Sequence, residues 1–389
     1  MSLSECRVKY IAITRDSSRK RCAHRMSGSY WSSTQRQQWQ FTKTSLAKEK
    51  QKLWVLECQL FPEGLNIVMD SSNNGNTQNS NGNASVKNIP ILHRDLHYDK
   101  DYNLRIYCYF LIMKLGRRLN IRQVALATAH VYLARFLLRA SVREVNLYLL
   151  VTTCVYLACK VEECPQYIRS LVSEARSLWP EFIPPDPTKV TEFEFYLLEE
   201  LDSYLMVHHP YKSMEQIVTV LKQQPYNLEL SPEELQNCWS LINDSYINDV
   251  HLIYPPHITA MACMFITITI QNNDSEKTTI FNNFMAQSQV DLQEVMGAVQ
   301  DQITLYDHWD KYHEPWIKFL LHTLYLRNNS NNQQQLQQQQ QQLQQLQQAQ
   351  AQQQQQQSQQ QSQQSQQGRS QSQSQSQMAT NGTATHASN

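Results

Sequence analysis

Two segments of the sequence have no polar face, and they restrict the folds open to this chain more than any other feature. One runs from Val145 to Val161 and the other from Ile258 to Ile270, and each is apolar on nearly every side of an expected helix. A helix without a polar face is usually surrounded by other helices. We therefore predict two helical units, each built around one buried central helix.

Amphipathic segments flank both of these central segments. Around the first they are expected at 101–115, 122–140, 166–178 and 187–205, and around the second at 213–222, 232–250, 290–306 and 314–326. Asp101 is expected to cap the first of these helices, while Asp186 and Pro187 provide an N-cap and first turn for the fifth helix. Alternating runs and hairpin dipeptides are nearly absent. The sequence predicts an all-α fold with two helical domains, at 93–205 and 206–327.

Three segments outside these domains have distinct compositions. In the segment 30–60 we expect one amphipathic helix from Thr34 to Leu60, because Trp39, Leu46, Leu53 and Leu60 recur every seven residues. Its solvated side should carry Lys43, Lys48, Lys50 and Lys52. Residues 71–88 are rich in Asn and Ser, and residues 328–389 in Gln and Ser. Such segments cannot bury apolar surface, so we predict a flexible loop and a disordered tail.

Residues 1–25 form a basic extension, with seven basic and two acidic residues. A disordered arm, a nuclear-localisation cluster and a transit-like leader are all compatible with this composition. A fourth interpretation, which we favour, is that translation starts at Met26 and that the extension lies upstream of it.

Several enzyme classes are excluded by missing motifs. The chain has 8 glycines and none in a G-x-G spacing, so neither a P-loop nor a dinucleotide-binding fingerprint can be formed. The sequence also contains no G-x-S-x-G and no H-E-x-x-H motif. We expect no catalytic residue and no cofactor, and therefore no enzymatic activity of this chain's own.

The cysteines and the paired histidines do not indicate a metal site. None of the nine cysteines forms a C-x-x-C pair, and the five-residue spacing of Cys154, Cys159 and Cys164 points successive thiols about 140° apart on a helix. They are expected to be buried core residues. His208 and His209 precede a proline between the two expected domains, so we predict a position at the domain joint.

Charge and hydropathy argue against nucleic-acid and membrane partners. The 34 basic and 34 acidic residues balance, and the basic extension leaves the helical part slightly acidic. A domain that holds DNA through its phosphates is usually strongly basic. No apolar run reaches the roughly 18 residues that span a bilayer. The sequence predicts a soluble intracellular protein that does not contact nucleic acid directly.

One pair of segments stands out because charge interrupts apolar sequence. Lys160 follows about fifteen mostly apolar residues, and Glu194 lies between Phe193 and Phe195. The lysine could simply reach solvent at a helix C-terminus, where cations are favourable, and the glutamate could be an isolated surface charge. The alternative is an ion pair between two helices. The residues alone leave both interpretations open.

At these positions the sequence resembles the cyclins, and among them the transcriptional C-type cyclins of the Mediator kinase module. The resemblance runs from Met26 to about Arg327. Its most specific segments are Ser29–Arg36, His93–Lys100, Leu157–Pro165 and Leu178–Phe182.

The resemblance implies two tandem five-helix cyclin boxes preceded by an N-terminal helix. It also implies a nuclear regulatory subunit that binds and activates a cyclin-dependent kinase, with other Mediator subunits and the RNA polymerase II holoenzyme as further partners. The polymerase C-terminal repeats and transcription factors would be phosphorylated, with repression or activation of transcription as the result. Cyclins hold the kinase through a lysine and a glutamate of the first box, which match Lys160 and Glu194; Glu163, Trp31 and Trp39 are further expected contacts.

The sequence departs from the cell-cycle cyclins at their substrate-docking groove. Arg105 matches the arginine of that motif, but Leu111 stands where those cyclins have a tryptophan, and Ala134 replaces an acidic residue near the arginine. We therefore do not expect cell-cycle substrates to dock there, which favours a transcriptional cyclin.

Two other functions remain open from the sequence. General transcription factors that bridge promoter DNA and polymerase have the same tandem helical fold, although they carry a zinc ribbon and a basic face. A scaffold would bind the kinase without raising its activity.

Overall fold

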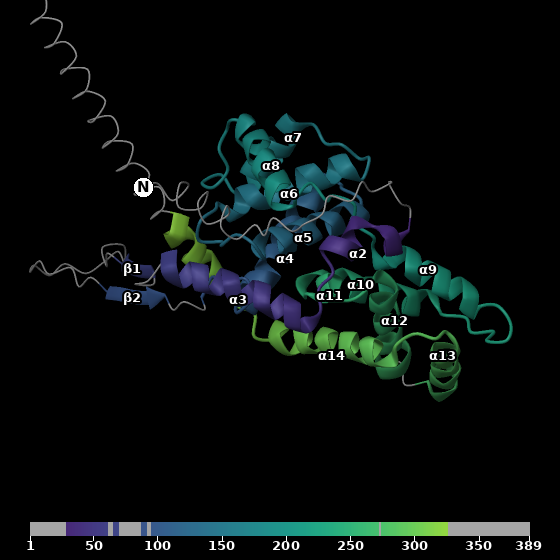
Figure 1. Ribbon diagram of the computed structural model, residues 1–389. Coiled ribbons are helices and arrows are strands. Elements are labelled where there is room, and N and C mark those ends of the chain that lie inside the picture. The colour runs from purple at the N-terminus through teal and green to yellow at the C-terminus, as the bar shows by residue number, and fades with distance from the viewer. Residues whose placement is uncertain (1–28, 61–64, 70–86, 92–94, 272–273, 326–389) are drawn as a thin grey trace, which may run out of the picture. The chain divides into compact units, whose positions relative to one another are not determined.

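The computed structural model describes residues 29–60, 65–69, 87–91, 95–271 and 274–325 (Figure 1). The expected basic extension 1–25, the tail 328–389 and residues 71–86 of the expected loop lie outside the described residues. The helices of both expected domains, up to His322, belong to one compact unit.

The first half contains the five expected helices. They are α4 (Tyr102–Arg118), α5 (Gln123–Leu137), α6 (Leu147–Val161), α7 (Ile168–Leu178) and α8 (Thr188–Glu200). The apolar helix α6 contacts each of the other four, which confirms its central place. Asp101 caps α4 as predicted, by accepting hydrogen bonds from the backbone N–H groups of Asn103 and Leu104.

The second half repeats this plan around a second apolar helix. Its long helices are α9 (Pro210–Leu221), α10 (Pro232–Asp244), α12 (Pro256–Phe265), α13 (Ser275–Gln287) and α14 (Leu292–Trp309), with a short α11 (Val250–Ile253), and residues 314–325 are again helical. Helix α12 packs against α9, α10 and α14. The all-α fold class is confirmed.

Some helices of the second half differ from the expectation. The segment expected as one helix over 232–250 breaks after Asp244, and the segment over 258–270 changes from α-helix to π-helix at Ile266. Helix α13 was not predicted. Only three of its residues, Phe281, Phe284 and Met285, are buried, so its apolar stripe is short.

Three helix boundaries in the first half were also predicted wrongly. Helix α4 continues past Gly116 to Arg118, so this glycine does not end the helix. It lies where α4 approaches α5 closely, because a Cβ atom there would be 2.5 Å from the Leu126 Cδ2 atom. The N-cap of α8 is Pro187 rather than Asp186, whose carboxylate accepts from the Thr188 N–H. That helix ends at Glu200, because Asp202 has a left-handed backbone with a φ of 51°.

The expected helix from Thr34 to Leu60 is interrupted. A 3-10 turn at Tyr30–Ser32 leads into α2 (Thr34–Gln38), and α3 (Lys43–Leu60) starts after a break. In this break Trp39 turns into the core, and the Phe41 N–H donates to the Leu252 carbonyl of the second half. These tertiary contacts override the seven-residue apolar period.

A two-stranded hairpin precedes the first half and was missed by the sequence reasoning. Strands β1 (Leu65–Met69) and β2 (Lys87–Ile91) are antiparallel, with Leu65 opposite Ile91 and Met69 opposite Lys87. The expected loop 71–88 therefore overlaps the start of β2. The strands are five residues each and a long Asn- and Ser-rich segment separates them, so they lack the signal of a tight turn.

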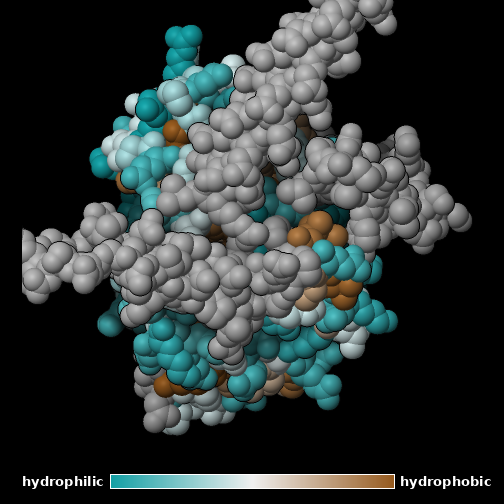
Figure 2. Space-filling view, turned by 90° about the vertical axis from the view of Figure 1, so that its left-hand side faces the viewer, coloured by the Kyte–Doolittle hydropathy of each residue, from teal (hydrophilic) through white to brown (hydrophobic). Residues whose placement is uncertain are grey.

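The polar faces of the outer helices reach the surface. In the space-filling view of Figure 2, hydrophilic residues cover most of the coloured area and hydrophobic residues form a few small patches. This distribution matches the amphipathic pattern of the segments around the two central helices.

Helix α3 lies across both halves of the compact unit (Figure 1). Its Leu46 packs with Leu138, which follows α5, and with Leu252 of α11. Lys43 forms an ion pair with Asp301 of α14, with Nζ 2.9 Å from Oδ2. The N-terminal helix thus contacts the first half and the second half at the same time.

A buried polar cluster holds the C-terminal part of α3 to the first half. Glu57 is 2% exposed and accepts a hydrogen bond from the Ser141 hydroxyl. His97 Nδ1 accepts from the Asp99 N–H, so the ring proton is on Nε2, which lies 3.5 Å from Glu57 Oε2. Burial raises the pKa of Glu57 to about 7, against smaller lowering by the Ser141 hydrogen bond and then by Arg143, and burial lowers the pKa of His97 to about 4.

We expect Glu57→Gln to change how stability depends on pH. Between about pH 4.5 and 7 the native carboxyl keeps a proton that the unfolded chain has lost, so the free energy of unfolding of the wild type falls as pH rises through this window. The variant lacks this titration. The free energy of unfolding of the variant, relative to that of the wild type, should therefore rise by about 3 kcal/mol between pH 4.5 and pH 8, as measured by urea denaturation.

A matched change at the exposed Glu215 of α9 serves as the control, and Glu215→Gln should follow the wild type at both pH values. A constant difference in free energy of unfolding between Glu57→Gln and the wild type across the window would show that folding does not raise the pKa of Glu57.

Candidate functional site

Lys160 and Glu194 are brought together by the packing of α6 on α8. Lys160 lies in the last turn of α6, and its Nζ atom is 2.6 Å from Oε1 of Glu194. The ammonium also lies 5.0 Å from the centre of the Tyr156 ring. Of the two interpretations left open by the sequence, the structure supports the ion pair.

The two side chains of this pair differ in exposure. The Glu194 side chain is 11% exposed and that of Lys160 is 43% exposed. An ammonium has three N–H donors, so Lys160 can bind Glu194 and still donate to carbonyl groups of a partner. The carboxylate beneath it fixes the position of the charge, which gives such a contact a defined register.

Two exposed aromatic side chains follow the members of this pair in the sequence, one directly after Glu194 and one seven residues after Lys160. Phe195, the residue after Glu194, is 74% exposed, and Tyr167, which precedes α7, is 83% exposed. Glu163 is exposed too and has a left-handed backbone with a φ of 53° directly after α6. We call Lys160, Glu163, Tyr167, Glu194 and Phe195 the first-half surface. The sequence did not single out Phe195 and Tyr167, because apolar periodicity does not separate an exposed aromatic residue from a buried one.

The two tryptophans expected as partner contacts have different environments. Trp31 is 60% exposed, with the Arg36 guanidinium 5.6 Å from its ring and the His257 ring at 5.6 Å. Trp39 is 1% exposed, and the guanidinium groups of Arg135 and Arg139 lie 5.0 and 4.4 Å from its ring. The expectation for Trp39 is therefore corrected: its side chain packs inside the chain and offers no surface to a partner.

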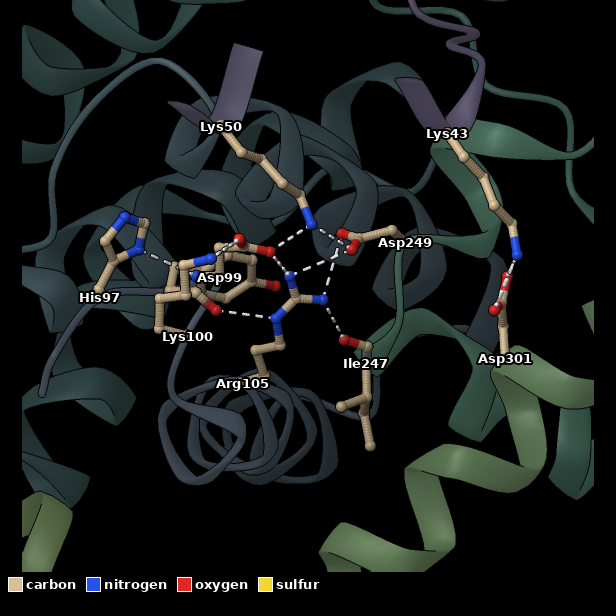
Figure 3. A network of polar contacts seen from close by, with 10 residues as sticks. Lys43, Lys50, His97, Asp99, Lys100, Arg105, Ile247, Asp249 and Asp301 are labelled. Carbon is tan, nitrogen blue, oxygen red and sulfur yellow. Dashed lines mark hydrogen bonds and ion pairs between the residues drawn. The ribbon is translucent and has the colours of Figure 1, made fainter. Parts of the chain in front are cut away.

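Arg105 is also occupied within the chain (Figure 3). It is 3% exposed, and its guanidinium binds Asp249 through two nitrogen–oxygen contacts of 3.1 and 3.2 Å. The same group donates to a carboxylate oxygen of Asp99 at 3.1 Å and to the carbonyl of Tyr98 at 2.8 Å. The Arg105 guanidinium is therefore engaged by groups of this chain on several sides.

Lys50 joins the same network from α3, so its prediction as a solvated residue was wrong. Its side chain is 18% exposed and pairs with Asp99 and, at 2.6 Å, with Asp249. Burial acts to raise the pKa of Asp249, but Arg105 and Lys50 outweigh it and hold that pKa below its usual value. A hollow of about 330 Å³ lies beside this network. Two cations and two carboxylates thus connect α3 with both halves.

The expectations for His209, Cys154 and Cys159 agree with the structure, while Cys164 is less buried than expected. His209 lies at the joint between the halves and contacts Thr128 and Tyr246. Five of the cysteines are buried, including Cys154 and Cys159, and Cys164 is half-buried. Among the described residues, no three His, Cys, Asp or Glu side chains are placed to bind a metal ion together. Within the same residues no helix is both long and apolar enough for a membrane span.

Sequence comparison identifies the family. The family model "Cyclin, N-terminal domain" matches residues 77–206. An RNA polymerase II holoenzyme cyclin-like subunit of Saccharomyces cerevisiae is 73% identical over 326 residues, which cover 78% of this chain and 99% of the relative. The chain is a cyclin.

Further relatives place this cyclin in the transcriptional branch of the family. The RNA polymerase II holoenzyme cyclin-like subunit of Candida glabrata is 69% identical over 335 residues, covering 78% of this chain and 99% of the relative. A chain of the CAK complex of Chaetomium thermophilum, solved with ATP-γ-S, is 15% identical, covers 75% of this cyclin and 81% of that chain, and has a TM-score of 0.50. This second likeness shows the fold alone. Family membership decides against a DNA-bridging general transcription factor, which would share only the helical fold.

Proposed function

We propose that this cyclin binds and activates a cyclin-dependent kinase of the transcription machinery, within the Mediator kinase module in the nucleus. The names of its relatives, which are RNA polymerase II holoenzyme subunits, support this assignment. The polymerase C-terminal repeats and transcription factors are the expected substrates of the kinase, and repression or activation of transcription is the consequence. Other Mediator subunits are the further partners.

The observation that carries the proposal is the half-exposed ion pair between Lys160 and Glu194. In the proposed complex this pair hydrogen-bonds to backbone groups of the kinase's regulatory helix, while exposed Phe195 and Tyr167 supply apolar contact area. The docked helix is then held in the position that lets the kinase complete its own lysine–glutamate pair around ATP. The cyclin performs no chemistry in this scheme and selects the active kinase conformation.

Two further residues extend the proposed contact. Glu163 adds an exposed carboxylate at the end of α6, and Trp31 adds an exposed indole before α2. Indole side chains are frequent anchors of protein interfaces. Trp39 is left out because it is buried.

The proposal is tested with the full-length cyclin and nuclear extract. Wild type and Lys160→Ala/Glu194→Ala are used to recover kinase, and the bound fraction is assayed on a polymerase repeat peptide. We expect the activity recovered by the double variant to fall about tenfold or more, because truncation removes the contact that sets the register.

A matched control is available on α8, the helix that carries Glu194. Lys189 and Glu192 form an exposed ion pair in the first turns of α8, with Nζ 2.8 Å from Oε2. Lys189→Ala/Glu192→Ala should recover as much kinase activity as the wild type. Equal recovery by the Lys160/Glu194 variant would move the interface elsewhere, and the absence of kinase activity with any form would contradict the proposed function.

A further inference from the structure

A line of hydrogen bonds crosses the joint between the two halves directly behind the end of α6. The Thr128 hydroxyl on α5 donates to Oε1 of Glu162, the residue that follows α6, at 2.6 Å. Thr128 Oγ1 is also 2.8 Å from Nε2 of His209, and Nδ1 of His209 is 2.7 Å from the hydroxyl of Tyr246. Tyr246 follows α10, so this line connects the second half with the C-terminal end of α6.

The chemistry of the four groups fixes the direction of each hydrogen bond. A carboxylate only accepts, so the single proton of the Thr128 hydroxyl is used on Glu162. Thr128 must then accept from His209, which places the ring proton on Nε2 and leaves Nδ1 to accept from Tyr246. Burial lowers the pKa of His209 to about 3, so the ring is neutral and carries one proton, as this arrangement requires. Thr128 and His209 each donate one hydrogen bond and accept one, while Tyr246 donates and Glu162 accepts, so each of the three contacts pairs one donor with one acceptor.

The second-half end of this line is held firmly. Tyr246 is 4% exposed, and its ring stacks on His251 with the ring centres 3.9 Å apart and the planes 5° from parallel. The His130 ring of α5 lies 5.9 Å from the Tyr246 ring. Packing on the ring restricts the Tyr246 side chain to one orientation, and its hydroxyl is thereby directed at His209.

In the first half the line ends at Glu162, where the backbone leaves the last turn of α6. The Glu162 N–H closes the last turn of α6 by donating to the Ala158 carbonyl at 2.9 Å. Glu163 then adopts its left-handed backbone, which is unfavourable for a residue other than glycine and persists only where neighbouring contacts impose it. Lys160 lies two residues before Glu162, in the same turn.

We propose that Thr128, His209 and Tyr246 are positioning residues for kinase binding, which through Glu162 hold the last turn of α6 so that Lys160 and Glu163 face the kinase correctly. The inference rests on the proposed function, and it assigns the second half a part in forming a surface that belongs to the first. None of the three positioning residues contacts the kinase in this scheme.

Thr128→Val in the full-length cyclin tests the proposal, since it removes the hydroxyl and keeps the branched shape. In the free variant we expect amide hydrogen exchange at residues 160–164 to become about fivefold faster or more, with α7, α8 and the second half unchanged. Kinase activation should fall by a similar factor, and Thr128→Ser, which restores the hydroxyl, should recover both.

Thr153→Val is the matched control. Thr153 is a buried threonine of α6 whose hydroxyl donates to the Leu149 carbonyl of its own helix and takes no part in the line. This variant should leave exchange at residues 160–164 and kinase activation near wild type. Equal losses in the two variants, or faster exchange throughout Thr128→Val, would overturn the positioning role.

Tyr246→Phe provides an independent test, because it keeps the stacked ring and removes only the hydroxyl. Tyr246→Phe should speed amide hydrogen exchange at residues 160–164 in the same way. Because both changes interrupt one line of hydrogen bonds, Thr128→Val/Tyr246→Phe should lose less exchange protection and less kinase activation than the two single losses added together. Fully additive effects would overturn the proposal. If the variants lose exchange protection but the wild type does not stimulate a kinase, the proposed function is refuted. The line of hydrogen bonds would then serve only to order the end of α6.

Discussion

Replacing Arg105 by leucine is expected to lower the free energy of unfolding by about 3–5 kcal/mol. Arg105 is 3% exposed, and its guanidinium is shared by Asp99 and Asp249, whose side chains are 19% and 20% exposed. The substitution leaves two largely buried carboxylates with less compensating charge. It also removes the donor to the carbonyl of Tyr98, which is itself costly to leave unpaired.

Urea denaturation of the full-length chain at pH 7 measures this loss. Arg117→Leu is the matched control, because Arg117 is exposed near the end of the same helix and its replacement should cost about 1 kcal/mol or less. A loss below about 1 kcal/mol for Arg105→Leu as well would mean that Lys50 alone compensates both carboxylates.

Trp39→Ala should destabilise the chain by about 3–5 kcal/mol, as expected for deletion of a large buried aromatic side chain. Its ring is 1% exposed and lies against the guanidinium groups of Arg135 and Arg139, so truncation opens a cavity and removes two cation–π contacts. Trp31→Ala, by contrast, should change stability by about 0.5 kcal/mol or less, because Trp31 is 60% exposed.

The two tryptophan variants are compared in the same denaturation and kinase-recovery assays. We expect the loss of stability only in Trp39→Ala and a loss of kinase recovery without a loss of stability in Trp31→Ala. Similar stabilities of the two variants would contradict the packing at Trp39, and full kinase recovery by Trp31→Ala would remove Trp31 from the proposed contact.

Helix positions, caps and burial are predicted best where residues nearby in the sequence decide the environment of a side chain. The all-round apolar pattern of 145–161 and 258–270 identified both central helices, and Asp101 was recognised as a cap from its place before an apolar stripe. Leu46 and Leu53 were expected on one apolar stripe of the N-terminal helix, and both are buried. Such features need no knowledge of the rest of the chain.

Contacts between distant segments could not be predicted in this way. Lys50 was expected in solvent because its helix face is polar, but Asp99 and Asp249, 49 and 199 residues further along, turn this face into an interface. For the same reason Thr128 and His209, 81 residues apart, did not stand out as partners. Lys160 and Glu194 stood out as charges within apolar sequence, but residue logic did not decide whether they pair, and the resemblance to cyclins favoured a shared role.

The attachment of α3 to both halves has a consequence for synthesis on the ribosome. Lys50 is translated 199 residues before Asp249, an interval of about 10–40 s at 5–20 residues per second. During this interval the second anchor of α3 does not yet exist, and Leu46 lacks the cover that Leu252 gives it. Docking of the N-terminal helix on both halves is therefore completed only after the second half has emerged.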